Sequence, residues 1–142
     1  MVRPMPEAPD PSPPAPSRVL IADDDPDVRA VLAAQLPLSF DIVGTAADTD
    51  EAIALAAEHR PDIALVDVEM PGGGGPRATR EIGAAAPATT IVALSADESD
   101  RVVRDMLAAG AVTYIRKDVS AEELTALLHE SVRARAQLPD AG

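Results

Sequence analysis

The chain has 142 residues, and its 24 acidic side chains outnumber 12 basic ones, which gives a formal net charge of −12. One domain of this length can bury an adequate core, whereas the acidic balance argues against nucleic-acid binding by this chain alone, because such binding needs clustered Lys and Arg. The lack of cysteine excludes disulfides and thiolate metal sites. With neither a long apolar run nor a signal-peptide core in the sequence, we expect a soluble cytoplasmic protein without membrane contact.

Residues 1–17 hold half of the chain's 14 prolines and almost no large apolar side chains. Such a segment cannot offset its own ordering entropy, so we predict a disordered, Pro-rich tail. A docking segment is the alternative, but an aromatic anchor is missing and Arg3 is the only basic side chain in the segment. The folded domain is expected to span residues 18–136, and residues 137–142 form a C-terminal tail or the start of a linker.

From residue 18 onwards, short apolar runs alternate with segments of helical periodicity. In chain order we expect strand 18–22, helix 26–36, strand 40–44, a helix capped by Asp48 or Thr49 and ending near residue 59, strand 63–66, helix 76–85, strand 90–94, a helix opened by Asp97 or Ser99 and ended by Gly110, strand 112–116 and a helix that begins at a capping box in residues 120–123. Strands that alternate with helices favour parallel strands joined by right-handed crossovers. The predicted fold class is α/β, a doubly wound five-stranded parallel sheet with helices on both faces.

Polar residues follow four of these strands. Asp23 and Asp24 follow the first, Asp67 the third, Ser95 the fourth and Lys117 the fifth. In an open parallel sheet, ligands bind outside the carboxyl ends of the strands, so these side chains are expected to converge on one pocket. The sequence therefore predicts a single site that holds three carboxylates, a hydroxyl and an ammonium group.

These groups suit phosphoryl transfer. Two carboxylates about 4 Å apart repel by roughly 4 kcal/mol at an effective dielectric of 20, so the cluster should recruit a divalent cation or raise a pKa, and Mg²⁺ suits hard oxygen ligands. Catalysis of phosphoryl transfer rests on positioning and on stabilisation by positive charge, which Mg²⁺, Lys117 and Ser95 would supply. Asp67 is the expected nucleophile because it is the lone central carboxylate, whereas Asp23 and Asp24 suit metal binding.

The stretch from Arg18 to Ala136 resembles the CheY-like receiver domain of two-component response regulators. The motifs that carry the resemblance are Asp23 with Asp24, Asp67 followed by Met70, Pro71, Gly72 and Gly75, Ser95 followed by Ala96, and Tyr114 with Lys117. Residues 110–124 are similar to receivers of the NarL/FixJ type. The resemblance implies a flavodoxin-like strand order of 2-1-3-4-5. It also implies that the backbone carbonyl of Glu69 completes the Mg²⁺ shell.

For function, the resemblance implies a phosphoprotein switch rather than an enzyme. A sensor histidine kinase or phosphotransfer protein would phosphorylate Asp67, and the chain would assist its own phosphorylation and dephosphorylation. Ser95 and Tyr114 would then switch the face formed by the fourth helix, the fifth strand and the fifth helix, and this face would control an output domain or protein. The resemblance is also compatible with a homodimer. Residues two places after the phosphoacceptor and after the hydroxyl, here Glu69 and Asp97, would tune the phosphoryl lifetime.

Two departures from the family pattern concern the loops. Asp118 stands where many receivers have a proline, which puts a cis peptide there in doubt. Residues 72–75 are all glycine, which suggests a loose loop beside the site.

Two alternative classes share parts of the pattern. In a haloacid-dehalogenase-like, Mg²⁺-dependent phosphatase, Asp23 would be the nucleophile. Such enzymes need a further acidic motif on a strand after the lysine, and this motif is missing after Lys117. Asp67 would also have no role in that mechanism. A flavin-binding module would need a phosphate loop and stacking aromatic side chains, and Tyr114 and Phe40 are the only rings apart from histidine. Mapping the residue that a small phosphoryl donor modifies separates the three.

Overall fold

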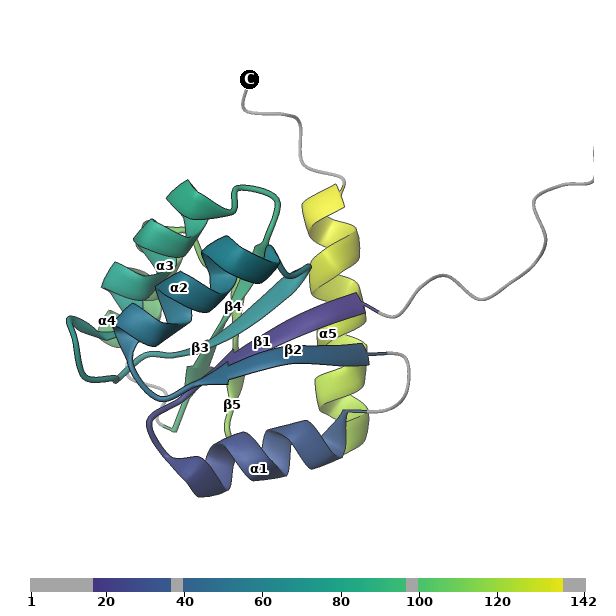
Figure 1. Ribbon diagram of the computed structural model, residues 1–142. Helices are drawn as coiled ribbons and strands as arrows, with labels where there is room; N and C mark the ends of the chain where they lie inside the picture. Colours follow the sequence, from purple (N-terminus) through teal and green to yellow (C-terminus); the bar gives the residue numbers. More distant parts are fainter. Residues whose placement is uncertain (1–16, 37–39, 97–99, 137–142) are drawn as a thin grey trace, which may run out of the picture.

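The computed structural model describes residues 17–36, 40–96 and 100–136. They form a five-stranded parallel sheet in the order β2-β1-β3-β4-β5 with helices on both faces (Figure 1), which confirms the predicted fold class and strand order. The elements are β1 (Ser17–Ala22), α1 (Pro26–Gln35), β2 (Phe40–Ala46), α2 (Thr49–His59), β3 (Ile63–Asp67), α3 (Gly74–Ala85), β4 (Thr90–Ser95), α4 (Asp100–Ala109), β5 (Thr113–Arg116) and α5 (Ala121–Ala136). None of these helices is long and apolar enough to cross a membrane.

The two faces of the sheet have separate cores because successive strand residues point to opposite sides. In the central strand β3, Ile63 and Leu65 belong to the core that includes Leu32 of α1 and Leu124 and Leu128 of α5. The intervening residues of β3 belong to the core that packs against α2, α3 and α4, and this core is rich in alanine. The small side chains let these three helices lie close to the strands whose ends carry the predicted site.

Capping accounts for the starts of three helices. Asp25 accepts a hydrogen bond from the backbone N–H of Asp27 at the start of α1, and Asp48, rather than Thr49, caps α2 through the N–H of Glu51. The Ser120 hydroxyl accepts the N–H of Glu123, as the capping box predicts. These local signals were readable in the sequence.

Tertiary packing moves other boundaries. β1 starts one residue early, at Ser17, β2 continues to Ala46, and β5 starts at Thr113. α3 begins at Gly74, two residues before the expected Pro76, because tertiary contacts override the low helix propensity of glycine. Asp97 and Ser99, predicted to open α4, lie outside the described residues, as do the predicted tails apart from Ser17.

Candidate functional site

The predicted strand-end residues meet at the carboxyl edge of the sheet. Nζ of Lys117 lies 2.8 Å from Oδ2 of Asp23 and 3.1 Å from Oδ1 of Asp67. Asp23 is fully buried and Asp67 is 2% exposed, whereas Asp24 faces solvent. One ammonium group therefore bridges two buried carboxylates, and a third carboxylate stands at the mouth of the site.

Backbone contacts fix the two buried carboxylates. The Asp23 N–H donates to the Ala46 carbonyl (3.0 Å), which continues the pairing of β1 with β2, and Oδ1 of Asp23 accepts the N–H of Asp25 (2.9 Å). On the neighbouring strand, Oδ1 of Asp67 accepts the N–H of Glu69 (3.2 Å). Both side chains are thus held where the chain leaves a strand and turns.

Burial is the main electrostatic influence on Asp67. It raises the pKa of the Asp67 carboxyl from 3.8 to about 6; the charge of Asp23 acts in the same direction, while the Glu69 N–H and the Lys117 ammonium act against it. Burial acts to lower the pKa of Lys117, but its hydrogen bond to Asp23 and the charge of Asp67 outweigh burial and raise that pKa above its ordinary value. Lys117 thus stays charged. Its single positive charge does not balance the three carboxylates of the site, so the site favours binding of a further cation.

Three carboxylates could hold a metal ion. One oxygen each from Asp23, Asp24 and Asp67 lies within 4.8 Å of the others. Octahedral Mg²⁺ binds oxygen at 2.0–2.1 Å, so opposite ligands stand about 4.2 Å apart. The three oxygens of this cluster are close enough for small side-chain movements to bring them onto one ion, and an all-oxygen donor set suits Mg²⁺. The residues present therefore fit the predicted cation.

A pocket of about 160 Å³ opens beside this cluster. Its walls are formed by Asp24, Asp67, Val68, Glu69, Ser95, Ala96, Val102 and Lys117. The sequence predicted the charged residues and Ser95 as members of this site, but it did not predict Val68 and Val102. Val102 comes from α4, and no sequence signal marks it, because an apolar residue of an amphipathic helix resembles any core residue. Asp23 does not line the pocket; its carboxylate contacts the ammonium group of Lys117, which does.

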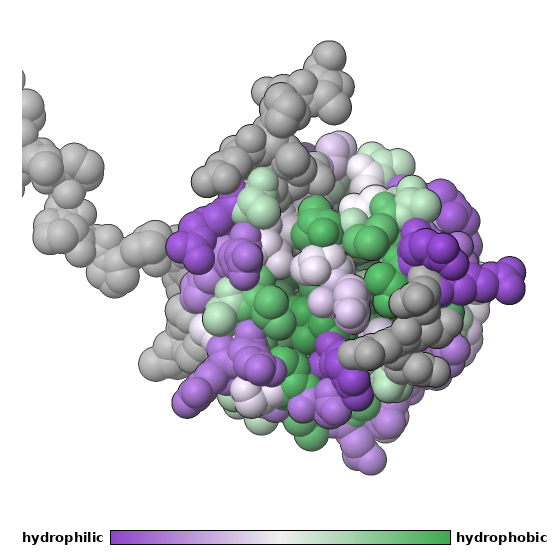
Figure 2. Space-filling model, turned by 180° about the vertical axis from the view of Figure 1, so that it is seen from behind, coloured by the Kyte–Doolittle hydropathy of each residue, from purple (hydrophilic) through white to green (hydrophobic). Residues whose placement is uncertain are grey.

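Ser95 and Tyr114 occupy different surroundings. Ser95 is buried at the end of β4, where its carbonyl accepts the N–H of Lys117 (2.9 Å). Tyr114 is 38% exposed on the edge strand β5 and does not line the pocket. Seen from behind, the molecule gathers apolar side chains on the side of β5, α4 and α5 (Figure 2), and Leu107 of α4 is 43% exposed.

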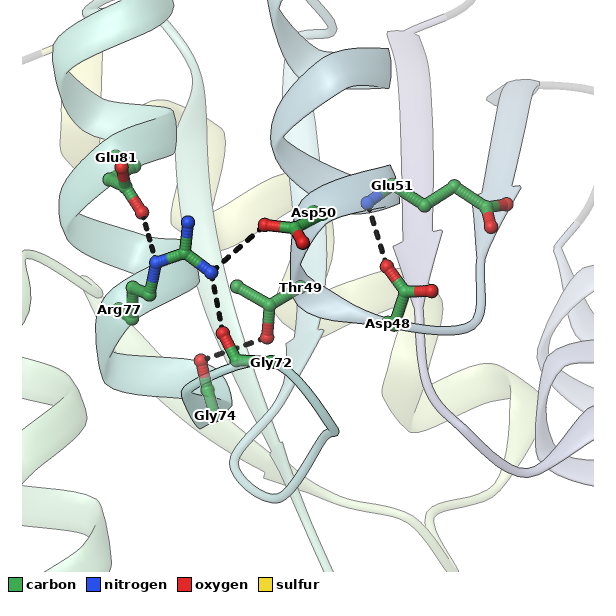
Figure 3. A network of polar contacts seen from close by, with 8 residues as sticks. All are labelled: Asp48, Thr49, Asp50, Glu51, Gly72, Gly74, Arg77 and Glu81. Carbon is green, nitrogen blue, oxygen red and sulfur yellow. Dashed lines mark hydrogen bonds and ion pairs between the residues drawn. The ribbon is translucent and has the colours of Figure 1, made fainter.

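The two departures from the family pattern have structural outcomes. The described residues contain no cis peptide bond, and the Asp118 carboxylate forms an exposed ion pair with Arg116 (3.3 Å). At residues 72–75, where the sequence suggests a loose loop, the Arg77 guanidinium and the hydroxyl of Thr49 donate hydrogen bonds to two of the carbonyls (Figure 3). Arg77 and Thr49 are 28 residues apart in the sequence, so only the fold could reveal this arrangement.

Residues 19–129 match the family model described as the response regulator receiver domain. The chain belongs to the response regulator receiver family. This membership confirms the predicted resemblance, and the haloacid-dehalogenase alternative receives no support.

Known relatives of this receiver include regulators and isolated domains. It is 38% identical over 123 residues to the transcriptional regulatory protein YxjL of Bacillus subtilis, an alignment that covers 84% of this chain and 56% of that protein. The signal receiver domain of NarL from Mycobacterium tuberculosis shares 30% identity at a TM-score of 0.80, covering 84% of this chain and 98% of that one. A chain of the CheX–CheY–BeF3–Mg²⁺ complex from Borrelia burgdorferi shares 28% identity at a TM-score of 0.75, covering 82% and 89%. The receiver spans about half the length of the curated relatives it matches.

Proposed function

We propose that Asp67 is a phosphoacceptor that takes its phosphoryl group from a phosphohistidine of a sensor histidine kinase or phosphotransfer protein in the cytoplasm. The observation that carries this proposal is the position of Asp67 at the end of the central strand, in one pocket with Ser95 and Lys117. The receiver would assist its own phosphorylation and dephosphorylation and act on no other substrate. Its output would be a domain or protein whose activity it regulates.

The chemistry follows from the charges of the site. A carboxylate oxygen of Asp67 attacks phosphorus and forms a P–O bond, while the P–N bond breaks and its electron pair stays on the imidazole nitrogen, which is protonated from solvent. Because the pKa of Asp67 is about 6, most of the carboxyl is ionised and nucleophilic at about pH 7.5. Lys117 would offset the negative charge on the phosphoryl oxygens.

Mg²⁺ is the proposed cofactor of this step, held by Asp23, Asp24, Asp67 and the backbone carbonyl of Glu69. When bound, it would neutralise charge on the transferring phosphoryl group and orient it. Two observations support the ion: the spacing of the three carboxylates, and the presence of Mg²⁺ with BeF3 in the name of the related CheX–CheY complex.

The experiment that tests the function is labelling with acetyl phosphate and Mg²⁺, followed by mapping of the modified residue by mass spectrometry. We expect one phosphoryl group on Asp67 and none on the Asp67→Asn variant, since Asn keeps the shape but lacks the nucleophile. Undiminished labelling of that variant would contradict the proposal. Labelling of Asp23 would instead favour the phosphatase alternative.

We predict that Asp24→Asn weakens Mg²⁺ binding by roughly tenfold or more, because it removes one anionic ligand from an otherwise intact cluster. Asp27→Asn is the matched control: it removes an exposed charge close by in α1, outside the cluster. Calorimetric titration of both variants measures the effect. Equal Mg²⁺ affinities for both would remove Asp24 from the metal site.

For the switch, we propose that the Ser95 hydroxyl binds a phosphoryl oxygen and that the Tyr114 ring then turns inward. Ser95 already lines the pocket, and Tyr114 is a partly exposed residue of β5. Apolar side chains gather on the side of the molecule that β5, α4 and α5 form (Figure 2). The change would alter this face, which would contact the output domain or a second copy of the receiver. Glu69 is exposed beside the pocket, where it could influence an attacking water; Asp97, proposed for the same role, lies outside the described residues.

A further inference from the structure

The glycine loop, residues 72–75, leads from the pocket wall into α3, whose first two residues are Gly74 and Gly75, and its conformation needs glycine. Three of its residues have positive φ angles, 94° at Gly72, 107° at Gly73 and 81° at Gly74. Glycine adopts such angles readily but loses more conformational freedom on ordering than any other residue. Contacts from outside the loop are therefore needed to hold it in one place.

The start of α2 supplies the first of these contacts. Thr49 is fully buried; its N–H, which the first turn of a helix leaves without a partner, donates to the Pro71 carbonyl (3.0 Å). Its hydroxyl donates to the Gly74 carbonyl (3.4 Å). A Cβ added at Gly72 would stand 3.2 Å from Cβ of Thr49. The loop thus lies directly against the N-terminus of α2.

Arg77 supplies the second group of contacts, from α3. Its Nη1 donates to the Gly72 carbonyl (2.5 Å) and to Oδ1 of Asp50 on α2 (3.0 Å), while its Nε lies 2.6 Å from Oε2 of Glu81 (Figure 3). A Cβ at Gly73 would stand 2.6 Å from Cδ of Arg77, so the aliphatic part of the arginine covers the loop. One side chain therefore ties the loop to α2 and α3 at once.

The loop is in turn connected to Asp67. The Gly75 N–H donates to the Val68 carbonyl (3.1 Å), and the Glu69 N–H donates to Oδ1 of Asp67 (3.2 Å). Val68 and Glu69 both line the pocket. A displacement of the glycine loop would therefore move the backbone that forms one pocket wall and that hydrogen-bonds the proposed nucleophile.

We propose that Arg77 is a positioning residue for the phosphoacceptor site: by holding the glycine loop against α2, it fixes the wall at Val68 and Glu69 and thereby sets Mg²⁺ affinity and phosphoryl lifetime. The inference rests on the proposed function. Exposed ion pairs contribute little to global stability, and the contacts of Arg77 with Asp50 and Glu81 are largely exposed. The effect of Arg77 should thus be on the site and not on unfolding.

The test compares Arg77→Ala and Arg77→Lys with Arg80→Ala, a control on an exposed arginine of the same helix. We expect Arg77→Ala to weaken Mg²⁺ binding by about threefold to tenfold and to change the half-life of the phosphoryl group by a similar factor, as small couplings through packed networks do. Arg77→Lys should have a smaller effect than Arg77→Ala, because one ammonium nitrogen can donate to both Gly72 and Asp50, as Nη1 of Arg77 does, whereas it cannot also reproduce the contact of Nε with Glu81. Amide exchange at residues 72–75, measured without Mg²⁺, should become faster in both.

A second control separates the bridge to α2 from the ion pair within α3. Glu81→Gln removes the i,i+4 partner but keeps the contacts with Gly72 and Asp50, so we expect a smaller effect than for Arg77→Ala. Asp50→Ala should act in the same direction as Arg77→Ala, and the double variant should be no worse than Arg77→Ala alone.

Two results would overturn the inference: Mg²⁺ affinity and amide exchange in Arg77→Ala equal to those in Arg80→Ala, or changes that follow only a lowered unfolding temperature. A wild-type receiver that takes up no phosphoryl group would instead refute the proposed function. In that case the Mg²⁺ titration and the amide exchange would still decide whether Arg77 holds the loop.

Discussion

Asp67→Asn is expected to stabilise the metal-free receiver by about 3 kcal/mol at about pH 7.5. Burial raises the pKa of Asp67 from 3.8 to about 6, and this rise corresponds to about 3 kcal/mol of unfavourable free energy when the group is ionised in the folded chain. Asn removes the charge and keeps the shape. Chemical denaturation of both proteins in the presence of a chelator measures the difference.

The advantage of Asp67→Asn should depend on pH. Above about pH 6 Asp67 is ionised in the folded and the unfolded chain, so the burial of its charge lowers wild-type stability by the full amount. Below pH 3.8 Asp67 is protonated in both states, and this loss of stability disappears. Between these two pH values the folded wild type binds more protons than the unfolded chain, so its free energy of unfolding falls as pH rises. Asp67→Asn lacks this titrating group, so its free energy of unfolding does not show this fall. Added Mg²⁺ should narrow the gap by binding the folded wild type.

Asp27→Asn again serves as the control, because it removes an exposed carboxylate outside the cluster. It should leave stability within about 0.5 kcal/mol of the wild type at each pH. A variant at Asp67 that is less stable than the wild type at about pH 7.5 would show that the ion pair with Lys117 outweighs the burial of the carboxylate.

Gly75→Ala should destabilise the receiver by about 2 to 3 kcal/mol, as overpacking in a dense core does. A Cβ at Gly75 would stand 2.5 Å from the Asp67 carbonyl oxygen, 2.8 Å from Cα of Val68 and 2.8 Å from Sδ of Met106. Two of these neighbours are backbone atoms of β3 and of the residue that follows it, so the end of this strand must move. We therefore also expect slower labelling by acetyl phosphate.

Gly83→Ala is the matched control within α3. Apart from its chain neighbours and the adjoining backbone of α3, nothing lies within 4 Å of a Cβ added there. Alanine is also a better helix former, so this change should stabilise the receiver by about 0.5 to 1 kcal/mol. Thermal unfolding of the two variants should give shifts of opposite sign. A neutral Gly75→Ala would mean that α3 can move away from β3 without cost.

The sequence alone determined the order of strands and helices along the chain and the polar residues that meet at the carboxyl edge of the sheet. Alternating apolar runs and helical segments imply a parallel sheet, and parallel strands carry the residues that follow them to one edge. That rule predicts that Asp23, Asp67 and Lys117 lie together, and the structure shows Lys117 paired with both carboxylates. Capping by Asp48 and Ser120 was equally local.

Only the tertiary structure decided what surrounds these residues. The glycine loop looks mobile in the sequence because glycine has no side chain to hold it, yet Thr49 and Arg77 hold it from two different helices. Val102 closes the pocket from α4, and α3 starts at Gly74 because its second residue, Gly75, fits closely against β3. Such contacts join residues distant in sequence through packing and unpaired helix-end groups, and neither leaves a local pattern in the chain.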